Sequence, residues 1–143
     1  MYKYILLVLF LISVSTFTYG QVGKIFSKEQ ADQLYGPVRY SFKFNNTKMF
    51  DFAKWSKKYL MFKIKDNKLT VANDERFVIY PEGTNQKSTD SFLYYSVSMI
   101  DKLIVEGQDS TTSIELRDNG IISITNGSYT LETATLCPPV CPE

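Results

Sequence analysis

The two cysteines of the chain lie near its end, in the sequence Cys-Pro-Pro-Val-Cys formed by Cys137 to Cys141. Two cysteines in an exported protein most simply form one disulfide. The prolines must then turn the chain, because bonded cysteines need their Cα atoms within about 7 Å. Three other uses stay open: a thiol redox pair, soft ligands for copper(I) or a shared metal, and a bond to another chain. We expect the bridge, with no metal site and no cofactor.

Histidine is absent from all 143 residues. Its absence removes the commonest general base, the usual zinc ligand and every triad or dyad built on imidazole. The carboxylates Asp66, Asp74 and Asp118 stand at expected turns, where they can hydrogen-bond the local backbone. Phosphate-binding glycine loops, calcium loops and nucleophile elbows do not occur in the sequence. We therefore do not expect an enzyme; the alternatives are a secreted enzyme that works through carboxylates and a thiol accessory that works through Cys137 and Cys141.

Positive charge is concentrated in the first half of the chain. Nine cations between Arg39 and Lys68 accompany two carboxylates, whereas eleven carboxylates from Asp74 onward accompany four cations. The basic region contains aromatic and cationic residues that could bind an anionic envelope component or another protein. These candidate binding residues are Trp55, Tyr59, Lys54, Lys57 and Lys58. In the competing interpretation the lysines are only the solvated side of a helix, and the aromatic residues belong to the core.

The first 20 residues have the pattern of a secretory signal. Lys3 is their only charge, Ile5 to Ile12 form an unbroken apolar run, and the small residues Thr18 and Gly20 follow two apart. The run is too short to span a bilayer of about 30 Å comfortably. We expect residues 21–143 to form one exported domain, periplasmic or extracellular, without a transmembrane segment. Export and a formal net charge of +1 argue against nucleic acid as a partner.

Residues 40–67 align without a gap on residues 92–119. Both segments predict an alternating strand, a short helix and a three-strand meander, which indicates an internal duplication. Copy one covers about 38–81 and copy two about 92–134, followed by the cysteine-containing tail, 135–143. Tight turns between the strands favour antiparallel pairing, so the predicted fold class is α+β, a single domain with a mainly antiparallel sheet.

Capping residues and glycines mark the expected element ends. Ser27 and Gln30 have the spacing of a capping box, which predicts a helix ending near Tyr35. Asn46 or Thr47 is expected to cap a helix over 48–58, on which Trp55 and Tyr59 would lie one turn apart, and Ser98 to cap one over 99–106. The expected core is Phe42, Phe44, Phe52, Phe62, Ile64, Leu69, Val71, Phe77, Ile79, Ile100, Leu103, Ile104, Ile114, Leu116, Ile122 and Ile124.

These observations predict a role mainly by exclusion. The chemistry-bearing patterns of most enzyme classes are missing, while the basic and aromatic region offers a contact surface. We expect a non-catalytic binding or protein-interaction module of the cell envelope or the secreted fraction.

Overall fold

The structure is a computed structural model that describes residues 21–141, so the predicted signal sequence, 1–20, lies outside the described residues. The described part is a single domain of mixed α+β class, as predicted, with two antiparallel sheets. None of its helices is long and apolar enough to cross a membrane. Its elements are β1 (Lys24–Ser27), α2 (Lys28–Tyr35), β2 (Val38–Asn45), α3 (Asn46–Lys54), β3 (Tyr59–Lys65), β4 (Lys68–Asn73), β5 (Val78–Tyr80), β6 (Phe92–Ser96), α4 (Val97–Gly107), β7 (Thr111–Arg117), β8 (Ile122–Asn126), β9 (Tyr129–Glu132) and β10 (Thr135–Cys137).

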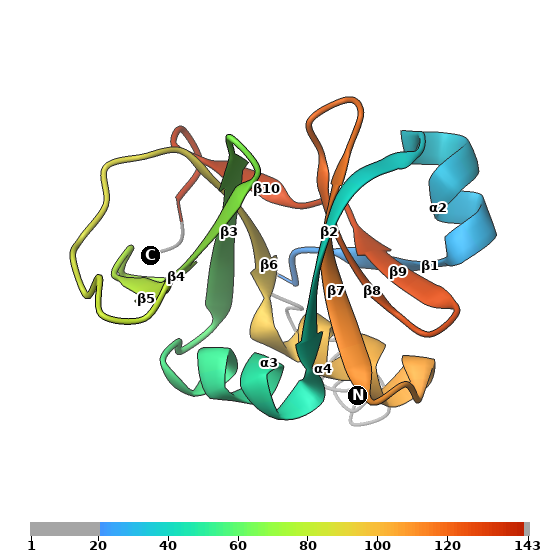
Figure 1. Cartoon of the computed structure of the whole chain (residues 1–143), viewed down its shortest axis with the longest axis horizontal. Helices are drawn as coiled ribbons and strands as arrows, with labels where there is room; N and C mark the ends of the chain where they lie inside the picture. The colour runs from blue at the N-terminus through green and yellow to red at the C-terminus, as the bar shows by residue number, and fades with distance from the viewer. Residues whose placement is uncertain (1–20, 142–143) are drawn as a thin grey trace, which may run out of the picture.

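The two halves of the chain exchange strands. Sheet A has the order β1-β9-β8-β7-β2, and sheet B has the order β10-β6-β3-β4-β5. Strand β2 therefore pairs with the meander of the second half, and β6 pairs with the meander of the first. Helix α3 carries the chain from sheet A to sheet B and α4 carries it back, at the same end of the molecule (Figure 1). Both halves show the predicted element order, whereas their origin by duplication stays a prediction.

Local turn chemistry accounts for the hairpins. The turn between β3 and β4 needs two residues with positive φ, and Asp66 and Asn67 supply φ values of 50° and 60°. Gly127 has a φ of 57° in the turn between β8 and β9. The Ser27 hydroxyl accepts from the Gln30 N–H at 3.2 Å, and the Gln30 side chain accepts from the Ser27 N–H, so the predicted capping box is confirmed.

The ends of α3 and α4 differ from the prediction. Asn45, and not Asn46 or Thr47, caps α3, because its side-chain oxygen accepts from the Lys48 N–H at 2.8 Å. Helix α4 begins after Ser96, so the predicted Ser98 cap is also wrong. The Ser96 hydroxyl makes no cap hydrogen bond; it accepts from the Val22 N–H at 2.6 Å and ties the start of the described chain to β6.

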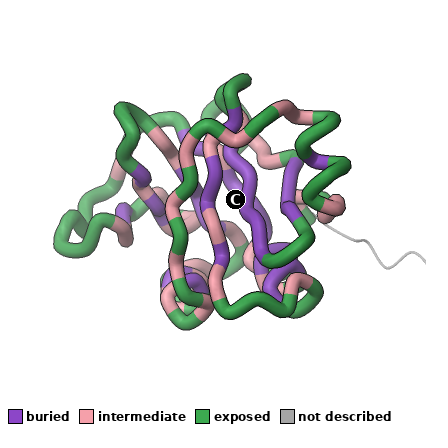
Figure 2. Tube along the Cα trace, turned by 45° about the vertical axis from the view of Figure 1, so that its right-hand side comes forward, coloured by how far each residue is buried: buried purple, intermediate pink, exposed green. Residues whose placement is uncertain are grey.

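The core lies between the two sheets and is closed at one end by α3 and α4. Figure 2 shows buried residues along the strands and on the inner sides of these helices. Most of the predicted core residues are buried, and Phe42, Phe44, Ile64, Ile79 and Leu116 are half-buried against them. The prediction for Phe77 was wrong, because its side chain is 36% exposed. The next residue, Val78, is buried, and successive residues of an extended chain point to opposite faces.

The predicted bridge between Cys137 and Cys141 is present, and it fixes the tail against sheet B. Cys137 is fully buried beside Met61 and Phe92, in a second apolar cluster. The Arg76 guanidinium donates to Cys137 Sγ at 3.0 Å from the loop between β4 and β5. Strand β10 pairs with β6 at the edge of sheet B, and the bridge ties the residues up to Cys141 to the end of β10.

We predict that changing both cysteines to Ser lowers the free energy of unfolding by no more than about 2 kcal/mol, because the bridge closes a loop of only five residues. Urea unfolding of the variant and of the reduced wild type measures the effect. Similar small losses in both are expected. A loss of about 4 kcal/mol in both would show that the bridge supports the whole fold.

Candidate functional site

A groove of about 330 Å³ lies between α3 and the segment that contains β5. Phe52, Val78 and Ile79 give it an apolar lining, which Trp55 extends at the rim, where it is 69% exposed. The polar lining consists of Lys48, Asp51, Glu82 and Asn85. An exposed indole beside an apolar hollow is the arrangement in which a ligand gains most contact area from one side chain.

The loop between β4 and β5 fixes the backbone at Trp55. Trp55 is the C-cap of α3, and its carbonyl accepts from the Asn73 side-chain amide at 3.2 Å. The Asp74 carboxylate accepts from the N–H groups of Lys57 and Lys58 at 3.0 and 2.8 Å. The sequence predicts only a turn at Asp74 and its neighbour Asn73. In the structure they also bind the backbone on either side of the helix end, at Trp55 and at Lys57 and Lys58.

Aromatic packing makes the floor of the groove a fixed surface. Phe52 is 2% exposed, and its ring meets those of Phe44 and Tyr80 edge to face, with centroids 5.5 and 5.7 Å away. Phe44 and Tyr80 also meet each other at 5.4 Å. The three rings come from β2, α3 and β5, so they join the two sheets directly beneath the groove.

Ion pairs balance the charges along the groove. Lys48 binds Glu82, and Lys54 binds Asp51 with a separation of 3.0 Å. The hydrogen bond between Lys48 and Glu82 raises the pKa of the lysine and lowers that of the glutamate, so both groups stay charged at neutral pH. The groove therefore presents an apolar surface between paired charges, and its carboxylates are already occupied by lysines.

The structure divides the predicted binding residues between two places. Trp55 lines the groove, whereas Lys57, Lys58 and Tyr59 line a separate hollow of about 340 Å³ beside the start of α4. Lys54 is exposed on α3. Helix α3 ends at Lys54 and Tyr59 begins β3, so the prediction that Trp55 and Tyr59 share a helical face was wrong. The Tyr59 ring packs edge to face on Tyr94, 5.2 Å away, and so contributes to the second apolar cluster.

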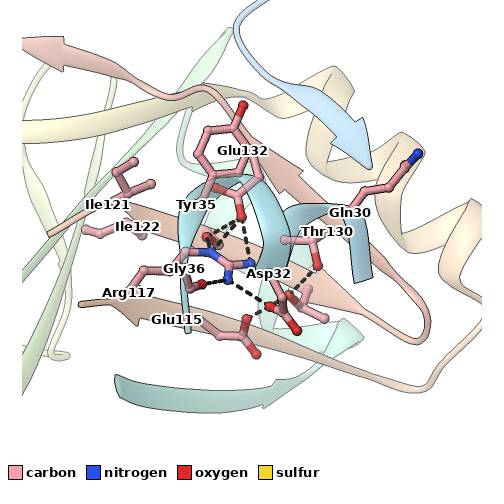
Figure 3. A network of polar contacts seen from close by, with 12 residues as sticks. Gln30, Asp32, Tyr35, Gly36, Glu115, Arg117, Ile121, Ile122, Thr130 and Glu132 are labelled. Carbon is pink, nitrogen blue, oxygen red and sulfur yellow. Dashed lines mark hydrogen bonds and ion pairs between the residues drawn. The ribbon is translucent and has the colours of Figure 1, made fainter. Parts of the chain in front are cut away.

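A buried guanidinium occupies the outer face of sheet A, under α2 (Figure 3). Arg117 is 1% exposed, and its Nε donates to Ser123 Oγ at 2.7 Å and to Glu132 Oε1 at 2.8 Å. Its Nη1 donates to Asp32 Oδ1 at 2.8 Å and to the carbonyl of Gly36. From β7, the Arg117 side chain thus contacts residues of β8 and β9, and it also contacts α2 and the residue that follows this helix.

Burial shifts the pKa values of carboxyl groups in the Arg117 cluster, by which we mean Arg117, Asp32, Ser123 and Glu132 with the nearby Glu115. It raises the pKa of Glu132, which is fully buried, and that of Glu115, which accepts from Thr125 Oγ1 at 2.8 Å. For Arg117, burial would lower the pKa, but the hydrogen bond with Asp32 and the charge of Glu132 outweigh it and raise the pKa. Glu132 Oε2 has no hydrogen-bond partner within residues 21–141.

The Arg117 cluster is best explained as the attachment of α2. Only Ala31 of this helix is buried, so apolar packing alone would hold it poorly. Alternation along β7 to β9 makes the polar residues of this face look solvent-exposed, and sequence reasoning therefore missed Arg117, Glu115 and Glu132. Burial also raises the pKa of Asp101, which lines the hollow beside the start of α4, whereas Glu115 and Glu132 lie on the outer face of sheet A, outside the groove lining.

Comparison of the chain with protein-family models, with curated proteins and with solved structures gives no match. Within the described residues, no group of three or more cysteine, aspartate or glutamate side chains is placed to hold a metal ion.

We predict that Glu115→Gln makes the protein more stable at pH 7. Because the pKa of Glu115 is raised in the folded state, the wild type loses stability as the pH rises through and above the ordinary glutamate value of 4.5. The neutral amide avoids that loss. Urea midpoints of both proteins should converge in acid and separate at neutral pH.

Glu82→Gln is the matched control and should behave in the opposite way. Lys48 lowers the pKa of Glu82, so its stabilising effect is present above pH 4.5 and is lost in acid. This variant should be slightly less stable than the wild type at pH 7 and equal to it in acid. Equal pH profiles for all three proteins would contradict the assignment.

Proposed function

We propose that this chain is an exported, non-catalytic binding module that contacts a partner protein through Trp55 and the groove beside it. The observation that carries the proposal is the 69% exposure of the indole next to an apolar groove of about 330 Å³. A large aromatic side chain left in water costs free energy, which burial in an interface recovers. Tryptophan is also among the residues that most often dominate protein–protein binding energy.

The charges of the groove favour a protein side chain over an anionic glycan or headgroup. Lys48, in the groove lining, and Lys54, the residue before Trp55, are each paired with a carboxylate. An anionic ligand would have to displace Glu82 or Asp51 from them, whereas an apolar side chain can enter without breaking either pair. The proposed contact should accordingly depend on apolar area and respond weakly to salt.

We also propose that the protein is exported. The signal-like N-terminus predicts it, and the bridge between Cys137 and Cys141 is typical of an oxidising compartment. In such a compartment a small domain with a rigid, aromatic surface can serve as a docking module without any reaction of its own.

We predict that Trp55→Ala weakens partner binding by about 2 kcal/mol or more, the usual cost of losing an anchoring tryptophan. The protein from Gln21 to Glu143 is immobilised and exposed to envelope or secreted proteins of the producing organism, and the retained proteins are quantified at two salt concentrations. Val105→Ala is the matched control, because Val105 is 73% exposed on α4, outside the groove lining.

A second variant tests the competing charge-based interpretation. Changing Lys54, Lys57 and Lys58 to Glu reverses the predicted basic residues and leaves the indole in place. Partners that are lost with Trp55→Ala and kept by the lysine variant support the proposal. Partners that survive Trp55→Ala, but are released by salt and by the lysine variant, would contradict it and identify an anionic ligand.

A further inference from the structure

Strand β2 leaves a long sheet edge without a partner. It is the outermost strand of sheet A, and it pairs only with β7 within the part of the chain that the structure describes. The strand has 8 residues, whereas the other outer strands, β1, β5 and β10, have 4, 3 and 3. After a register shift between Val38 and Tyr40, the pairing is regular from Tyr40 to Asn45. Alternate N–H and C=O groups of this stretch point away from β7 and can pair with another strand.

The core-facing side chains of this edge are incompletely covered. Phe42 and Phe44 are half-buried, whereas Ile114 and Ile124, on the neighbouring strands of the same sheet, are fully buried. Tyr40 continues the row and is also half-buried. A strand added beside β2 would place its own apolar residues against these rings and complete the sheet on this side.

The cations of β2 belong to the part of the basic region that forms no ion pairs with described residues, as do Lys58, Lys65 and Lys68. Lys48, Lys54, Lys57 and Lys63 each pair with a carboxylate. Arg39 and Lys43 are exposed, and neither makes an ion pair with a described residue; Arg39 lies over the ring of Tyr40, 5.7 Å from its centroid. The unpaired positive charge of this edge therefore lies beside its free backbone groups.

We propose that β2 binds an extended acidic segment of a partner protein as an additional strand of sheet A. The backbone of the segment pairs with the free edge of β2, its carboxylates face Arg39 and Lys43, and its alternate apolar residues cover Tyr40, Phe42 and Phe44. The inference concerns a surface other than the groove beside Trp55, and it stands whether or not that groove binds a partner.

The positive charges of β2 favour an acidic segment over a second copy of the chain as the added strand. Two β2 strands paired antiparallel around Ser41 would place Lys43 opposite Arg39 of the other copy, and like charges directly opposite are destabilising. The same cations guard the edge against self-association. A segment with carboxylates at alternate positions is instead attracted to these cations.

The test uses a synthetic peptide, acetyl-Glu-Val-Glu-Val-Glu-Val-amide, and the folded protein from Gln21 to Glu143. Amide hydrogen exchange should slow in residues 38–45, with the edges at β1, β5 and β10 unchanged, and binding should weaken as salt rises. The double variant Arg39→Glu, Lys43→Glu should bind this peptide at least about tenfold more weakly and should instead bind the corresponding Lys-Val peptide. Near-ultraviolet circular dichroism of the variant confirms that it is folded.

Three controls make the outcome decisive. Methylation of alternate peptide nitrogens should abolish binding if backbone pairing carries it, and Trp55→Ala should leave the affinity unchanged. Equal affinity of the charge-swapped variant and the wild type, or protection at another edge, would overturn the proposal. A dimer of the free protein that protects residues 38–45 would also overturn it, because the edge would then serve a second copy.

Discussion

The backbone hydrogen bonds of β2 with β7 and of β6 with β3 tie each half of the chain to the meander of the other. Each five-stranded sheet contains strands from both halves, so both halves are needed to form either sheet. The exchange also sends α3 and α4 across the same end of the core in opposite directions. Because α3 crosses from sheet A to sheet B, its last turn arrives beside β5, where Trp55 and the groove are found.

The two faces of sheet A are stabilised by different physics. The inner face buries Ile114 and Ile124 against the core, whereas the outer face buries Arg117 and Glu132 under α2. A buried ion cluster often contributes little net stability, but the loss of one member leaves an uncompensated charge at a cost of several kcal/mol. We therefore regard Arg117 as the residue that fixes where α2 docks, with Asp32 and the carbonyl of Gly36 supplying the contacts from the helix side.

Features with a local cause could be predicted from the sequence. The turn at Asp66 and Asn67, the capping box at Ser27 and the bridge of Cys137 with Cys141 depend on residues close together in the chain. The exchange of β2 and β6 depends on pairing across more than 30 residues, and alternation alone does not select the partner strand. The site was only partly predictable for the same reason. The sequence pointed to Trp55, but contacts from Asn73, at the end of β4, and from Asp74, just after it, fix the backbone where the helix ends.

The central claim is that the indole at the end of α3 contacts a partner protein, and site-specific photo-crosslinking tests it most directly. A benzophenone amino acid is placed at position 55 or at position 105 of the full chain, expressed in the organism that makes it, and activated by light. The account predicts one or a few discrete protein adducts from position 55 and none of them from position 105, which is equally exposed but outside the groove lining. The same adducts from both positions, or no protein adduct from position 55, would contradict it.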